Sequence, residues 1–159
     1  MHEFESIAQN RFLKPSRRST SEQIVGLLIF SMVFFLLEIF NRTVVKEPLF
    51  QQTAWTSYYL LTSTAMWILW RRFSLRVIKL EFSGFLLALI LQIIWGVDCF
   101  GFKETLPTLF ALTLLWSNNL VTTVLFWKKE KLSGALFLLP FLWSLYVMGE
   151  NMMKCISNP

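Results

Sequence analysis

Hydrophobic residues gather in five long runs that short polar segments separate. The runs cover residues 24–40, 55–70, 80–97, 106–127 and 132–149. Each approaches the ~20 residues that an α-helix needs to cross about 30 Å of hydrocarbon, and none alternates apolar with polar residues as a β-barrel strand would. The pattern predicts an all-α membrane protein, a bundle of five transmembrane helices. These form one domain (24–154) between a polar, basic N-terminal tail (1–23) and a C-terminal tail (155–159).

The positions of the basic residues give this bundle an orientation. Eleven of them lie in the N-terminal tail, the second connection and the fourth connection, whereas four lie in the remaining segments. The four are Arg42, Lys46, Lys103 and Lys154. Because cytoplasmic loops are enriched in Lys and Arg, we expect the N-terminus in the cytoplasm and the C-terminus outside. Termini on opposite sides of the membrane require an odd number of spans. Five spans meet this condition, and four or six would not.

Composition narrows the classes of function. Hydrophobic residues make up 55% of the chain and charged residues 16%, which is too apolar for a soluble domain of this size. The basic residues form no continuous face, so nucleic acid is not an expected partner. His2 is the only histidine, and Cys99 and Cys155 form no CxxC motif. Neither a metal site nor a required cofactor is therefore predicted, and no nucleophile–base pair indicates an enzyme. Both cysteines fall on the outer side, where a disulfide and two free thiols are alternatives.

Aromatic and polar residues share the outer half of the predicted bundle. Trp55, Tyr58, Tyr59 and Thr62 have the i, i+3, i+4, i+7 spacing of one helix face. Later runs and the first connection (41–54) add further members to this set, which are Gln92, Trp95, Trp143, Tyr146, Glu150, Phe50, Gln51 and Gln52. The set fits a pocket for a flat aromatic ligand, and it also fits ordinary helix packing with an outer aromatic belt.

Polar residues within the runs suggest structural roles and one alternative function. Asn118 and Asn119 lie near the middle of the fourth run, where we expect hydrogen bonds between helices. Pro140 lies inside the fifth run and predicts a kink. Glu38 and Glu150 lie near the ends of runs, where solvation is cheap, and they leave a proton-coupled transporter open as an alternative. A small accessory subunit that packs against a larger membrane complex is another alternative.

Several motifs of the chain have counterparts in one known family. The last run carries Ser133-Gly134, Leu138-Leu139-Pro140-Phe141-Leu142, Trp143 and then Asn151. The first connection reads Lys46-Glu47-Pro48-Leu49-Phe50-Gln51-Gln52, the second run begins Trp55-Thr56-Ser57-Tyr58-Tyr59, and the third holds Gln92. These segments resemble the TspO/MBR family, the tryptophan-rich sensory proteins and translocator proteins. The chain departs from the family where Gln51 and Gln52 replace two prolines of the first loop and Phe50 replaces its tryptophan.

The resemblance implies a pocket enclosed by five helices and covered by the first loop. It implies a membrane receptor or carrier for porphyrins such as protoporphyrin IX or haem, or for sterol-like ligands, which regulates porphyrin or stress responses. Any enzymatic activity would be light-dependent porphyrin breakdown. The membrane would be the bacterial inner membrane, and the partners would be lipids and a second copy of the chain. The residues carried over as ligand-binding are Phe50, Trp55, Tyr58, Gln92, Trp95, Trp143 and Asn151, with Arg42 and Lys46 as carboxylate partners.

Overall fold

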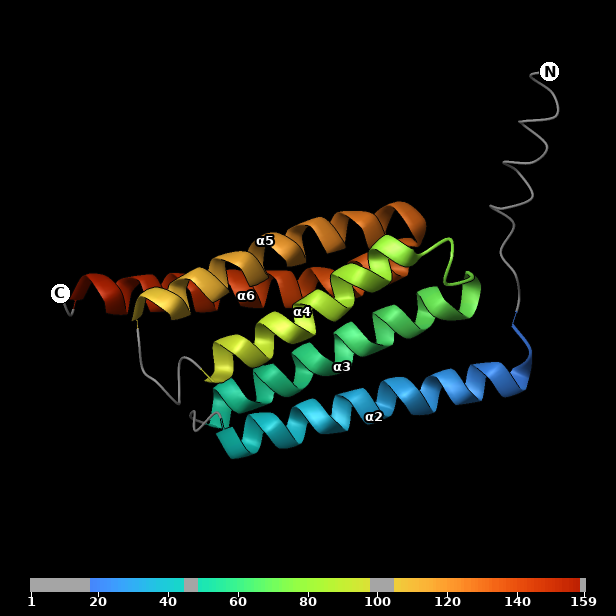
Figure 1. The fold of residues 1–159 in the computed structure, drawn as a ribbon, viewed down its shortest axis with the longest axis horizontal. Helices are drawn as coiled ribbons and strands as arrows, with labels where there is room; N and C mark the ends of the chain where they lie inside the picture. Colours follow the sequence, from blue (N-terminus) through green and yellow to red (C-terminus); the bar gives the residue numbers. More distant parts are fainter. Residues whose placement is uncertain (1–17, 45–48, 98–104, 158–159) are drawn as a thin grey trace, which may run out of the picture.

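The computed structural model describes residues 18–44, 49–97 and 105–157, and it forms a bundle of helices that run antiparallel to their neighbours (Figure 1). Five helices occur in the described ranges, and they are α2 (Thr20–Val44), α3 (Leu49–Arg72), α4 (Lys79–Val97), α5 (Thr105–Lys129) and α6 (Lys131–Ser157). All of these except α3 are long and apolar enough to cross a membrane. The predicted all-α membrane protein is confirmed, and α3 as a fifth span remains a prediction.

Helix α3 is more polar than its neighbours, yet it lies inside the bundle against α2 and α6. Four of its hydroxyl groups find partners within the helix, because each of these four donates a hydrogen bond to the carbonyl oxygen four residues earlier. These donors are Thr56, Ser57, Thr62 and Thr64, at 2.7 to 3.0 Å. Such bonds satisfy a hydroxyl without water. The composition of α3 is therefore compatible with a position in the hydrocarbon region.

Contacts at the basic end of the bundle agree with the expected grouping of the connections. Arg18, just before α2, donates hydrogen bonds to the carbonyl oxygens of Trp70 and Phe73 at the end of α3. At the same end Arg72 forms an ion pair with Glu130, between α5 and α6. The N-terminal segment, the second connection and the fourth connection thus share one end, as the charge pattern predicts. The side of the membrane that this end faces remains a prediction.

Several helices extend beyond the apolar runs that predicted them. The start of α2 is set by a capping box, in which the Ser19 N–H donates to Glu22 Oε2 and the Glu22 N–H donates to Ser19 Oγ,. At the end opposite Arg18 and Arg72, α2 continues to Val44 and α3 begins at Leu49. The expected first connection of 41–54 is therefore wrong in its bounds. The first turn of α3 contains Phe50, Gln51 and Gln52. A helix can extend into such a polar segment because its backbone groups remain hydrogen-bonded there.

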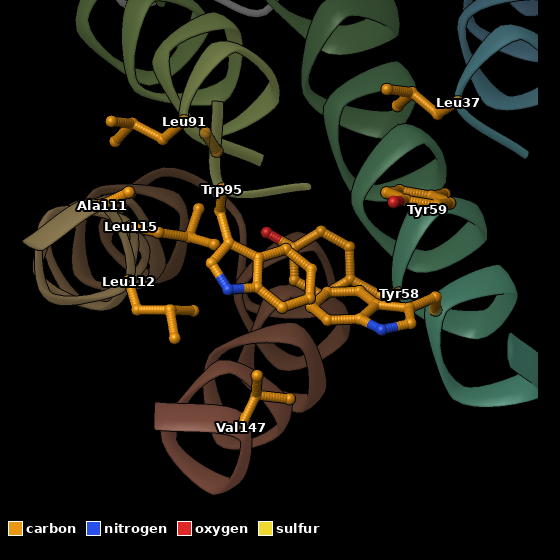
Figure 2. Close-up of a cluster of buried hydrophobic side chains, with 11 residues drawn as sticks. Leu37, Tyr58, Tyr59, Leu91, Trp95, Ala111, Leu112, Leu115 and Val147 are labelled. Carbon is orange, nitrogen blue, oxygen red and sulfur yellow. The ribbon is translucent and has the colours of Figure 1, made fainter. Parts of the chain in front are cut away.

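The interior of the bundle contains two groups of buried side chains at different depths. One lies toward the basic end and includes Phe30, Met66, Phe85, Phe126 and Phe137. The other lies toward the opposite end and is richer in tryptophan and tyrosine (Figure 2). The second group contains most of the residues that the sequence singled out for ligand binding.

Candidate functional site

Five aromatic side chains from three helices meet in the half of the bundle away from the basic end. We call Trp55, Tyr58, Tyr59, Trp95 and Trp143 the aromatic cluster. The ring of Trp55 is central, with its centroid 4.9 Å from that of Trp95, 5.5 Å from that of Tyr58 and 5.8 Å from that of Trp143. Trp55 and Trp95 are fully buried, whereas Trp143 is half-buried. The structure therefore brings together four of the predicted site residues at one depth.

The spacing of these residues along their helices explains the convergence. Trp55, Tyr58 and Tyr59 lie on one face of α3, since positions three and four apart are neighbours on a helix. Aliphatic side chains of α4, α5 and α6 close the other sides, as Figure 2 shows for Leu91, Leu112, Leu115 and Val147. The rings contact one another directly in this arrangement.

Two asparagines of α5 tie the surrounding helices together. The Asn119 side chain is fully buried, and its Nδ2 donates a hydrogen bond of 3.1 Å to the Tyr58 hydroxyl on α3. Asn118 Nδ2 donates a hydrogen bond of 2.9 Å to the carbonyl oxygen of Gly84 on α4. The predicted hydrogen bonds between helices are confirmed. The sequence did not predict that Tyr58 would be the partner of Asn119, although both are polar groups within apolar runs.

Gln92 differs from these asparagines because its carbonyl group is left unsatisfied. The residue is only 1% exposed, and its Oε1 has no hydrogen-bond partner among the described residues. Gln92 lies three positions before Trp95 and so shares the face of α4 that carries this member of the aromatic cluster. An unpaired buried acceptor destabilises a fold by about 1–3 kcal/mol. Such a group is a candidate for an interaction with a ligand.

A groove between α3 and α6 reaches the aromatic cluster from the side of the bundle. Its volume is about 320 Å³. The lining residues are Ala54, Ser57, Tyr58, Leu61, Leu139, Pro140 and Trp143. Tyr58 and Trp143 belong to the aromatic cluster as well, so the groove and the cluster are continuous. α6 continues as a helix through Pro140, whose side chain forms part of the groove wall.

The chain matches the model of one known protein family. The family model described as the TspO/MBR family matches residues 42–153. This chain belongs to the TspO/MBR family. The match includes α3, α4 and α5 and most of α6, while α2 before Arg42 lies outside it. No curated protein matches the chain. Family membership and the four strongly apolar helices make the chain an integral membrane protein.

The rim of this TspO/MBR protein, at the end of the bundle opposite the basic end, carries a polar network that the sequence did not predict. The Glu38 carboxylate accepts hydrogen bonds from Arg42 Nε at 2.7 Å and from Thr56 Oγ1 at 2.8 Å. Glu38 is only 9% exposed, and these hydrogen bonds satisfy its carboxylate. The expectation of cheap solvation at this position is therefore wrong. The Arg42 side chain is 68% exposed, and Glu38 holds it in place at the rim.

A second polar contact at the rim joins the ends of α3 and α6. Gln51 Nε2 donates a hydrogen bond of 3.2 Å to Glu150 Oε2. Only a residue with a side-chain donor can make this bond. The bond joins two helices that border the groove.

The remaining predicted residues are not all part of the aromatic cluster. Asn151 lies two turns beyond Trp143 on α6, and its Nδ2 donates to the carbonyl oxygen of Val147 in the same helix. The side chain of Phe50 and the whole of Lys46 lie outside the described residues, as do the side chains of Cys99 and Cys155. The roles proposed for Phe50 and Lys46 and the pairing of the cysteines stay predictions.

Proposed function

We propose that this protein is a membrane receptor or carrier for a tetrapyrrole or a related apolar ligand, which binds at the aromatic cluster. The observation that carries the proposal is the unpaired Oε1 of Gln92 beside a group of buried aromatic rings. Membership of the TspO/MBR family supports the same class of ligand.

The chemistry of a porphyrin matches the groups that the site presents. Its macrocycle offers a wide apolar face on which the rings of Trp55, Trp95 and Trp143 can stack. Gln92 Oε1 is an acceptor, so the ligand atom that faces it must be a donor, such as an N–H or O–H group. Arg42 uses its Nε to bond Glu38, and its side chain is otherwise exposed at the rim. The two terminal amino groups of Arg42 can therefore pair with a porphyrin carboxylate.

Access to the site requires movement of side chains. Ligand pockets typically enclose about 300–1,000 Å³, and the groove between α3 and α6 is at the low end of this range, with about 320 Å³. Trp143 lines the groove and stacks on Tyr146, with 5.2 Å between the ring centroids. A rotation of Trp143 would join the groove to the interior of the aromatic cluster. In this proposal the ligand reaches the site laterally, from between α3 and α6.

Equilibrium binding of protoporphyrin IX to the full chain in lipid nanodiscs tests the proposal. The Soret absorbance should report saturable binding to the wild type. Gln92→Leu should weaken binding about tenfold, because it removes one hydrogen bond worth about 1.4 kcal/mol. Gln23→Leu makes the same chemical change at the opposite end of the bundle and should leave the affinity unchanged.

Two results would overturn the proposal. One is the absence of saturable binding by the wild type. The other is equal binding by the wild type and Gln92→Leu, which would leave the unpaired amide without a ligand role. A stoichiometric protein partner that co-purifies with a chain unable to bind porphyrin would instead favour the accessory-subunit alternative.

A further inference from the structure

A second groove lies between α2 and α3, nearer to the basic end of the bundle. Its volume is about 160 Å³. The lining residues are Leu27, Phe30, Ser31, Phe34, Leu60, Ser63, Thr64 and Trp67. It shares no lining residue with the groove between α3 and α6. Its wall on α2 also lies outside the segment that matches the TspO/MBR family.

Ser63 places an unused hydrogen-bonding group in this apolar groove. The residue is 4% exposed, and its Oγ has no hydrogen-bond partner among the described residues. Thr64, which also lines the groove, differs because its hydroxyl donates a hydrogen bond of 2.7 Å to the carbonyl oxygen of Leu60. The Ser63 hydroxyl is thus a buried donor at the wall of the groove that has no partner among the described residues.

Arg71 places a positive charge at the basic end of the same groove. Its guanidinium carbon lies 4.9 Å from the centroid of the Trp67 ring. Neighbouring arginines have other partners, since Arg72 pairs with Glu130 and Arg18 bonds to two backbone carbonyls. Within the described part of the chain, Arg71 has no carboxylate partner. Its guanidinium donors are available to an anion.

These three groups follow one another along a single stripe of α3. Ser63, Trp67 and Arg71 are spaced i, i+4, i+8, which aligns them on one face over about 12 Å. The stripe presents a hydroxyl donor, then an indole ring, then a cation, in the direction of the basic end. Tryptophan favours the interfacial level of a bilayer, and Arg71 lies one turn beyond it. The apolar part of the groove begins on the other side of Ser63, with Phe34 and Leu60.

We propose that the α2–α3 groove binds one anionic phospholipid. An acyl chain lies along the apolar part, the ester region lies near Trp67 with a carbonyl oxygen that accepts a hydrogen bond from Ser63, and the phosphate pairs with Arg71. The order of groups along the lipid matches their order along α3. Charge complementarity selects an anionic headgroup over a zwitterionic one, because no ion pair among the described residues neutralises the positive charge of Arg71,.

Native mass spectrometry of the full chain with phosphatidylglycerol and with phosphatidylcholine tests this proposal. The wild type should retain phosphatidylglycerol at least tenfold more tightly. Arg71→Gln should abolish this preference, whereas Arg76→Gln, the same change on an exposed arginine of the connection that follows α3, should preserve it. Ser31→Phe should fill the groove from α2 and displace the lipid without altering any charge.

The proposal is overturned if Arg71→Gln and Arg76→Gln weaken retention equally, since general attraction to a basic surface would then account for it. Equal retention of the two lipids by the wild type overturns it too, as does tight binding of phosphatidylglycerol to Ser31→Phe. Thermal unfolding of each variant in the same detergent separates loss of lipid from loss of fold. Porphyrin binding should be unchanged in all three variants, so this test is independent of the proposed function.

Discussion

Gln92 and Asn119 are two buried amides with opposite energetic consequences. Asn119 Nδ2 donates to the Tyr58 hydroxyl at 3.1 Å, so both groups are satisfied in the absence of a ligand. Gln92 Oε1 has no such partner among the described residues. Binding sites often retain groups that destabilise the empty protein, because those groups gain a partner only when the ligand arrives. The account predicts that these two positions respond differently to the same substitution.

Gln92→Leu should raise the stability of the empty protein by about 1 kcal/mol, because an unpaired buried carbonyl is replaced by an apolar group of similar size. Asn119→Leu should lower stability by about 1–3 kcal/mol, because it leaves the Tyr58 hydroxyl buried without its donor. Thermal unfolding of the two variants in detergent measures the difference. A loss of stability in Gln92→Leu equal to that in Asn119→Leu would contradict the assignment of Gln92 as an unsatisfied group.

The sequence predicted which aromatic residues would meet, but not how the polar ones would pair. Trp55, Tyr58, Trp95 and Trp143 converge because helical spacing and antiparallel topology together determine their face and depth. The partner of Asn119 depends also on the rotation of α5 against α3, which an apolar run does not define. The bond between Glu38 and Thr56 was missed for the same reason.

At the scale of helices, α5 and α6 approach closely where glycine replaces a side chain. A Cβ atom added at Gly134 on α6 would lie 2.6 Å from the Cα atom of Trp127 on α5. Backbone atoms cannot move aside as a flexible side chain can, so the helices would have to separate. Small residues at helix contacts allow this kind of close packing in membranes.

Gly134→Ala should therefore destabilise the bundle, by about 1–3 kcal/mol, through overpacking between α5 and α6. Gly149→Ala on the same helix is the matched control, because a Cβ atom there would meet no other atom within 4 Å. It should be neutral or slightly stabilising, since alanine favours helix more than glycine does. Unfolding of both variants by denaturant in the same detergent provides the comparison. Equal effects would show that the close approach at Gly134 is not stabilising.

The centres of the helices were predictable from sequence, whereas their ends were not. Hydropathy marks the part of each helix that suits hydrocarbon, and all five predicted runs lie within observed helices. It does not mark the polar turns that continue beyond that part, such as the first turn of α3 with Gln51 and Gln52. The expected first loop was consequently too long. Helix α3 is less apolar than the other four helices, and its crossing of the membrane stays a prediction.

At the scale of the whole molecule, the bundle has a basic end and a rim of acidic and polar groups at the opposite end. At the basic end Arg18 bonds to the end of α3, and Arg72 pairs with Glu130. The polar rim at the opposite end contains Glu38, Gln51 and Glu150. The positive-inside rule assigns the basic end to the cytoplasm. This orientation would place the aromatic cluster in the outer half of the membrane and the α2–α3 groove in the inner half.

Reporter fusions in bacterial cells test the topology that this orientation requires. A fluorescent protein that matures only in the cytoplasm should fluoresce when fused to the N-terminus and stay dark when fused to the C-terminus. Alkaline phosphatase, which is active only outside the cytoplasm, should show the reverse pattern. Fluorescence from both fusions would mean an even number of spans and would remove α3 from the set of membrane-crossing helices.

The central claim is that the aromatic cluster is a ligand site, and quenching of tryptophan fluorescence by protoporphyrin IX tests it most directly. The account predicts saturable quenching of the wild type in detergent, with most of the saturable signal lost in Trp143→Ala. Trp127→Ala should quench as the wild type does, because Trp127 is an exposed residue at the basic end of α5. If Trp143→Ala and Trp127→Ala both quench like the wild type, the ligand does not bind at the aromatic cluster.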